Sequence, residues 1–182
     1  MEVGPLFGIF LQLTTVPGHL QGVPALSFFF VAHVVGQPRT VPFLSAQKTT
    51  SVLGDKTVLQ QVEEVVKMVA KASEKGLNAD GSMVHEANLD MGHIDTERHW
   101  WVQAEAVVGF YNLYQYFGDE EALRKSLRCW QYIKDHLNDW EGGEWWWSCD
   151  PDGNINRHDD KAGFWKCPYH NSRMCLEIME RE

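Results

Sequence analysis

The stretch 96–118 has the periodicity of an α-helix, yet apolar side chains cover most of the circumference of that helix. A helix exposed to solvent keeps a polar face, so this one is predicted to be an inner helix packed on several sides. Asp119 follows directly and is a good N-cap for an outer helix, with basic residues on one side and apolar residues on the other. The predicted apolar stripe of the outer helix consists of Leu123, Leu127, Trp130, Ile133 and Leu137. Two helices joined by so short a turn are predicted to form an antiparallel helical hairpin.

Two more helices are predicted, one on each side of this hairpin in the sequence. Residues 56–75 have helical apolar spacing between a plausible N-cap, Asp55, and a stop at Gly76. A last helix is predicted for about residues 170–181, after Pro168.

The segments between the helices are predicted to be loops and turns. The stretch 77–92 contains Asp80-Gly81 and is predicted to be a loop. The stretch 144–155, with the turn Asp150-Pro151-Asp152-Gly153, suggests a small β-hairpin.

The N-terminal segment differs from the rest of the chain. Of the 41 Asp, Glu, Lys and Arg residues, only Glu2 and Arg39 lie within residues 1–47. Five prolines in this segment would interrupt any long helix. The apolar run 23–36 is shorter than the ~20 residues of a membrane span, so no membrane association is predicted. We therefore expect residues 1–50 to be an atypical segment and residues 51–182 to form the domain.

Charge and cysteine content exclude some functions. The formal net charge is −9, and no run of basic residues is present, which argues against a nucleic-acid partner. None of the four cysteines forms a Cys-x-x-Cys pair, so a zinc ribbon or a thiol-redox motif is not indicated. Reduced cysteines are typical of a cytoplasmic protein.

The tryptophans are concentrated in one part of the chain. All eight lie between positions 100 and 165, and five of them form the clusters 100–101 and 145–147. An indole offers a flat apolar face and one donor, which suits stacking against a sugar ring. Plain core packing is the alternative, and it is favoured for Trp130; for Trp100 and Trp101 both interpretations stay open.

Glu105 and His170 are the residues best suited to chemistry. An ionised Glu105 inside an apolar helix would be costly to bury, so it either faces a polar cavity or forms a structural ion pair. His170 is predicted at the N-terminus of the last helix, where the positive end of the helix dipole favours a neutral imidazole that can act as a base. Most histidines are not catalytic, so position alone does not decide its role.

No metal site is predicted. Residues 150–154 begin like a calcium loop, but the sixth and twelfth positions are Ile155 and Lys161 instead of Gly and Glu. The run 158–160, His-Asp-Asp, has no further ligand nearby in the sequence and is predicted to be a solvated loop.

Three strings carry a resemblance to a known family: HWWVQAEAVVGFYNLYQYFGD (99–119), EGGEWWW (141–147) and KAGFWKCPYHNSRMCLE (161–177). They resemble the cellobiose 2-epimerase branch of the N-acylglucosamine 2-epimerase superfamily, from about Gly54 to the C-terminus. The run WKCPYHN at 165–171 is closer to this branch than to the N-acylglucosamine branch.

The resemblance implies an all-α fold for residues 51–182, namely a partial (α/α)6 barrel of antiparallel helical hairpins with a small β-hairpin insertion. It also implies an isomerase that acts on an oligosaccharide with a reducing-end glucose. The family opens the sugar ring, removes the proton at C2 and returns it to the other face, with neither a metal nor an organic cofactor. Two histidines on opposite faces serve as acid and base.

The resemblance also implies roles for individual residues. By match of motif, His170 would be one of the two catalytic histidines, and Trp165 would stack on the substrate. Trp100 and Trp101 would line the cleft, and Glu105 would position groups there.

The chain departs from the family upstream of these strings. Family members are considerably longer, and their first half supplies an arginine, a cleft histidine and the other catalytic histidine, none of which has a match here. We therefore expect part of the active site to be missing, the chain alone to be weakly active or inactive, and the open half barrel to favour self-association. The alternatives are an N-acylglucosamine 2-epimerase, a glycoside hydrolase on a helical barrel, and a non-catalytic sugar-binding protein. A hydrolase would need a second carboxylate to act with Glu105, and none is obvious.

Overall fold

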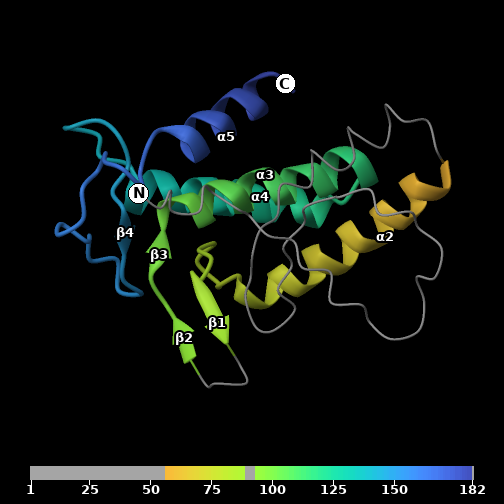
Figure 1. The fold of residues 1–182 in the computed structure, drawn as a ribbon, viewed down its shortest axis with the longest axis horizontal. Helices are drawn as coiled ribbons and strands as arrows, with labels where there is room; N and C mark the ends of the chain where they lie inside the picture. Colours follow the sequence, from red (N-terminus) through yellow and green to blue (C-terminus); the bar gives the residue numbers. More distant parts are fainter. Residues whose placement is uncertain (1–55, 89–92, 182) are drawn as a thin grey trace, which may run out of the picture.

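The computed structural model describes residues 56–88 and 93–181, so the predicted atypical segment 1–50 lies outside the described residues. The described part is mostly helical, with two small antiparallel sheets of two strands each (Figure 1). Its elements, in chain order, are α2 (Lys56–Ser73), η1 (Glu74–Gly76), β1 (Glu86–Asn88), β2 (His93–Asp95), β3 (Arg98–His99), α3 (Trp100–Phe117), α4 (Glu120–Tyr132), η2 (Ile133–Leu137), β4 (Ser148–Cys149) and α5 (Tyr169–Met179).

Helix α3 is the centre of this arrangement. It contacts α2, α4 and α5, and Figure 1 shows α5 on one side of it and α2 on the other. Every residue from Val102 to Phe110 is buried, which confirms the predicted inner helix. The helix ends at Gly118, whose φ of 69° is the left-handed conformation that glycine adopts without strain, and the Gly118 amide donates to the Tyr114 carbonyl at 2.8 Å.

The start of α3 was predicted four residues too early. Arg98 and His99 form strand β3, which pairs antiparallel with β4, so the helix begins at Trp100. The Trp100 amide then donates to the Trp147 carbonyl at 3.0 Å. This pairing joins segments about fifty residues apart, which the local helical pattern does not contain.

Helix α4 begins where the sequence predicts, because the Asp119 carboxylate accepts hydrogen bonds from the amides of Glu121 and Ala122, both at 3.0 Å. It is antiparallel to α3, and the Ser126 hydroxyl donates to the Val107 carbonyl at 2.8 Å across the helix pair. The predicted apolar stripe is wrong at Leu127, which is 57% exposed. The side chains that α4 buries are smaller or more polar: Ala122, Ser126, Cys129 and Tyr132. The helix then widens into one π-type turn, η2, which buries Ile133 and Leu137.

Helix α2 confirms the prediction for residues 56–75, because α2 and η1 together cover 56–76. Val66 and Ala70 are buried, whereas Val65 and Met68 of the same helix are 46% and 60% exposed. The helix therefore leaves part of its apolar surface uncovered within the described residues.

The β-structure differs from the prediction in its position. Strands β1 and β2 form an antiparallel hairpin that begins inside the stretch 77–92, which was predicted to be a loop. The turn at 150–153 is present, and the Gly153 amide donates to the Asp150 carbonyl at 3.0 Å. Next to this turn a single bridge joins Cys149 to Ile155, while the strand β4 itself pairs with β3.

Helix α5 begins at Tyr169, directly after Pro168, as the sequence predicts to within one residue. It packs along α3, and its buried residues are Asn171 and Met174. This packing brings the first turn of α5 to the first half of α3, where the predicted site residues lie.

Candidate active site

The His170 imidazole lies among three of the predicted site residues. Its Nδ1 is 2.7 Å from the Glu105 Oε1 atom, and its ring is edge-on to Trp100, with the centroids 5.4 Å apart. The Trp101 ring is tilted against it at 5.8 Å. The helices that carry these residues, α3 and α5, are joined here although the residues are about seventy positions apart in the sequence. The structure therefore brings together four of the five predicted site residues.

The Glu105 carboxylate, only 5% exposed, has two basic partners. Its Oε1 accepts a hydrogen bond from the Arg173 Nη2 and also contacts His170. The charge of a buried carboxylate is thus compensated, as it must be if the group is to remain ionised. Of the two alternatives for Glu105, the ion pair is present, with Arg173, and the same carboxylate contacts His170.

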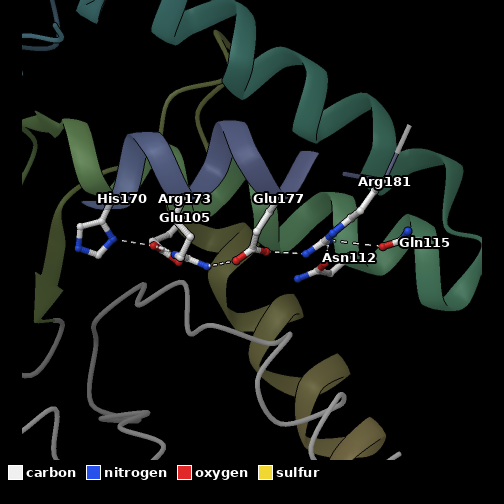
Figure 2. Close-up of polar contacts among 7 residues, drawn as sticks. All are labelled: Glu105, Asn112, Gln115, His170, Arg173, Glu177 and Arg181. Atoms are coloured by element: carbon white, nitrogen blue, oxygen red, sulfur yellow. Dashed lines mark hydrogen bonds and ion pairs between the residues drawn. The ribbon is translucent and has the colours of Figure 1, made fainter. Parts of the chain in front are cut away.

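Arg173 is a residue that the sequence analysis missed. It lies three residues after His170 on α5, so both side chains project toward α3 from the same face. Its Nη1 donates to Glu177 at 2.8 Å, and Glu177 also binds Arg181. Figure 2 shows this row of alternating charges along α5. The spacing 170, 173, 177 and 181 was visible in the sequence as a helical repeat of polar residues.

The contact with Glu105 determines which nitrogen of His170 is available. A carboxylate accepts from Nδ1–H, so the neutral ring then carries its lone pair on Nε2. The second ring nitrogen points away from Glu105 (Figure 2). The His170 side chain is 31% exposed. An imidazole held in this way is suited to accept a proton from a substrate.

Trp165 is not part of this cluster in the structure. It lies in the loop before α5, is 68% exposed, and meets Phe164 edge-on with the centroids 4.8 Å apart. Its role in stacking on the substrate stays a prediction.

Lys166, its neighbour, is a second residue that the sequence analysis missed. Its side chain is 1% exposed and donates to the carbonyls of Trp145 and Lys161 at 2.8 and 2.6 Å and to Glu144 Oε1 at 3.1 Å. The same nitrogen lies 4.7 Å from the centroid of the Trp100 ring. Burial lowers the pKa of Lys166, opposed by its ion pair with Glu144. Lys166 thus fixes the loop that leads into the first turn of α5.

Glu144 accepts hydrogen bonds from Lys166 and from two further donors. Its Oε1 accepts from the Asn171 side chain at 2.6 Å and from the Trp145 amide at 3.0 Å. Glu144 also has a φ of 65°, an uncommon conformation for a residue other than glycine. Because Asn171 follows His170 directly, Glu144 provides a second polar contact at the start of α5, in addition to the contact between His170 and Glu105.

A cluster of His85, Asp95 and His99 lies beside Trp101. His85 Nδ1 is 2.7 Å from Asp95 Oδ2, and the His85 ring is edge-on to Trp101 at 5.9 Å. Burial and the neighbouring His85 lower the pKa of His99 to about 4. The cluster was not predicted, because His85 lies in the stretch assigned to a loop and His99 in the stretch assigned to the start of a helix.

The potential ligand atoms of this cluster lie within 4.8 Å of one another. The His85 and His99 rings, however, are stacked 3.9 Å apart at 23° to each other. Two imidazoles that bind one tetrahedral ion approach it from different directions. The nearly parallel rings of His85 and His99 would therefore have to move before both could bind a common ion. We therefore treat the cluster as a support for Trp101.

The two stretches rejected as metal sites from the sequence have ordinary local structure. The Asp150 carboxylate accepts from the amides of Asp152 and Asn154, as in a tight turn. Asp159, in the exposed run 158–160, accepts from the Asn156 side chain at 2.8 Å.

Together, the fold and the site describe a helical protein in which a histidine contacts a buried carboxylate and two indoles. A family model described as N-acylglucosamine 2-epimerase (GlcNAc 2-epimerase) matches residues 50–173. The chain belongs to this family, and the resemblance noted in the sequence is confirmed.

Known relatives narrow the comparison to one branch. The chain is 59% identical over 128 residues to a cellobiose 2-epimerase of Bacteroides fragilis, a match that covers 70% of this chain and 33% of the relative. It is 40% identical over 135 residues to a cellobiose 2-epimerase of Ruminococcus albus, covering 74% of this chain and 34% of the relative. These relatives are isomerases, and the matches span about a third of their length.

Solved structures give the same result for the fold. A sugar epimerase from a ruminal bacterium superposes with a TM-score of 0.67 at 36% identity, covering 76% of this chain and 36% of that one. A cellobiose 2-epimerase from Bacillus thermoamylovorans gives a TM-score of 0.61 at 45% identity, covering 71% and 32%. The helical fold is thus that of part of a sugar epimerase. Among the helices of residues 56–88 and 93–181, none has the length and apolar content needed to cross a membrane.

Proposed function

We propose that this chain carries one half of the acid–base site of a sugar 2-epimerase acting on cellobiose or a related oligosaccharide with a reducing-end glucose. The observation that carries the proposal is the His170 ring, which lies against Trp100 and Trp101 with its Nδ1 on the Glu105 carboxylate. The relatives named cellobiose 2-epimerase support the choice of substrate.

In the proposed reaction the sugar ring opens first, so that C2 lies next to a carbonyl carbon and its proton becomes acidic. His170 Nε2 takes the C2 proton, and the C–H electron pair moves into an enediolate. A proton delivered to the opposite face of C2 then re-forms the C–H bond with inverted configuration. A single imidazole reaches one face, so the reaction needs a second acid–base group, which in this proposal comes from outside the described residues.

The other predicted residues have supporting roles. Trp100 and Trp101 provide apolar faces beside the reacting carbon, and Glu105 fixes the orientation of the His170 ring. The exposed indole of Trp165 would stack on the sugar unit farther from the reaction. In this proposal, residues 51–182 form the C-terminal half of an (α/α)6 barrel, which is open on one side, and net turnover by the chain alone is weak.

Deuterium exchange tests the proposal. The chain is incubated with cellobiose in heavy water, and deuterium at C2 of the reducing-end sugar is followed by NMR. We expect exchange above the protein-free rate, a reduction of about a hundredfold or more in His170→Gln, and no change in the exposed-loop control His158→Gln.

Other outcomes favour the competing functions. Release of free glucose would indicate a glycoside hydrolase, and exchange with N-acetylglucosamine instead of cellobiose would indicate the other branch of the family. Saturable cellobiose binding without exchange would indicate a non-catalytic sugar-binding protein. Equal exchange in wild type and His170→Gln would refute the assignment of His170.

A further inference from the structure

Arg173 and His170 share a single oxygen atom. Glu105 Oε1 is 2.7 Å from His170 Nδ1 and also accepts a hydrogen bond from Arg173 Nη2. Although burial alone would lower it, the pKa of Arg173 is raised by its bonds with Glu105 and Glu177. The guanidinium is therefore charged at any pH at which the protein is folded.

Among residues 56–88 and 93–181, the titratable and charged groups that face the His170 ring are Glu105 from α3 and Arg173 and Tyr169 from α5; the Trp100 and Trp101 rings are uncharged. A buried carboxylate alone would stabilise the imidazolium form, which cannot accept a proton. A positive charge on the same oxygen offsets that effect.

We propose that Arg173 is a positioning residue that keeps His170 neutral with Nε2 free to accept a proton, by sharing the Glu105 oxygen with it. This inference rests on the proposed role of His170 as an acid–base group. Arg173 does not touch the substrate in this account and acts through Glu105.

The position of Arg173 is itself fixed by a row of charges along α5. Glu177 accepts from Arg173 Nη1 at 2.8 Å and binds Arg181, which in turn reaches Asn112 of α3 (Figure 2). The second turn of α5 and the residues just after its end are thereby tied to α3. Arg173 Nε is buried and has no hydrogen-bond partner among the described residues, so the two carboxylates provide the polar contacts that place the guanidinium, which also lies 5.8 Å from the centroid of the Tyr169 ring. Loss of Glu177 should therefore loosen Arg173 without removing its charge.

The test is an NMR titration of the His170 imidazole in the full chain with labelled histidine. In Arg173→Met the ring should stay protonated to a pH about one unit higher than in wild type, because the carboxylate is no longer shared. Arg173→Lys, which keeps the charge, should titrate close to wild type, and Glu177→Gln should lie between wild type and Arg173→Met.

The matched control is Arg124→Met, which removes an arginine bound to Glu121 on the exposed side of α4. This variant should leave the His170 titration unchanged. If Arg173→Met does not fold, as judged by circular dichroism, the proposal is tested by comparing the His170 titration in Glu177→Gln with that in wild type. Superimposable titrations in wild type and in every folded variant would overturn the proposal.

The titration does not depend on catalysis, so its result is separate from that of the exchange experiment. Where C2 exchange is measurable, the acidic limb of its pH profile should move upward in Arg173→Met by the same amount as the titration. If exchange is absent while the titration shifts as expected, the charge sharing is correct and the proposed function is wrong. A purely structural role for Arg173 would lower stability without moving either curve.

Discussion

Lys166→Met should destabilise the protein by far more than an ordinary lysine substitution. The Lys166 ammonium is buried and donates to two backbone carbonyls at 2.6 and 2.8 Å and to a carboxylate at 3.1 Å. Methionine fills similar space but donates no hydrogen bond, so those carbonyls lose their partner.

The magnitude follows from the separate contacts. Hydrogen bonds from a charged donor contribute roughly 1.5–3 kcal/mol each, and the two to carbonyls are counted at the lower end. The contact with Glu144 is counted as zero, because that carboxylate is 30% exposed and keeps its bonds with Asn171 and the Trp145 amide. The free energy of unfolding should therefore fall by about 3 kcal/mol, equivalent to a melting temperature about 10 °C lower for a domain of this size.

Urea unfolding followed by circular dichroism measures this difference, with Lys125→Met as the matched control. Lys125 forms a single ion pair with Glu74, whose side chain is 39% exposed, so this variant should lose at most about 1 kcal/mol. Equal losses in the two variants would show that the bonds made by Lys166 do not hold the loop before α5, and the reasoning would be refuted.

Three further predictions concern other parts of the molecule. The fold lowers the pKa of His99 from its ordinary 6.5 to about 4, so between these pH values the unfolded chain binds more protons than the folded one. Wild type should therefore lose stability relative to His99→Gln as the pH falls through this range. The same difference in urea midpoint between the two proteins at about pH 7 and at about pH 5 would contradict this. Gly81→Ala should lower the free energy of unfolding by more than about 2 kcal/mol, because φ is +95° and a Cβ would lie 2.7 Å from the Arg128 carbonyl oxygen. At Gly118 φ is +69° but no atom lies within 4 Å of a Cβ, so the same change should lower it by about 1 kcal/mol. Equal melting temperatures for the two variants would contradict the steric argument. The exposed apolar residues of α2 should favour self-association, so light scattering after gel filtration should give a mass above that of one chain, and a monodisperse monomer would refute it.

The sequence predicted the helices well where their ends carry local signals. Asp119 caps α4, Gly118 ends α3 and Pro168 precedes α5, and each signal acts within a few residues of the helix end. The burial of α3 was predictable because its apolar residues surround the whole helix.

The errors occur where distant contacts override a local pattern. Strand pairing between β3 and β4 delays the start of α3, and the hairpin of β1 and β2 forms in a stretch with loop-like composition. In α4, the close approach to α3 at Ser126 favours small side chains on the buried face, which leaves Leu127 exposed.

The candidate site was predicted only in part, because some of its contacts also join residues far apart in the sequence. Glu105 and His170 were visible as unusual residues in helical surroundings, and the structure joins them. Arg173 and Lys166 were missed because their partners, Glu105 and Trp145, lie 68 and 21 positions away. The polar spacing along the last helix does not by itself show that Arg173 faces another helix. Charged residues near a helix usually face solvent, and only the packing of α5 on α3 shows that these do not.

A crystal structure of the chain with cellobiitol, an open-chain analogue of the ring-opened sugar, tests the central claim most directly. The account predicts C2 of the open unit within about 3.5 Å of His170 Nε2, with the Trp100 and Trp101 rings beside it. A sugar bound elsewhere, or C2 facing away from the imidazole, would contradict it.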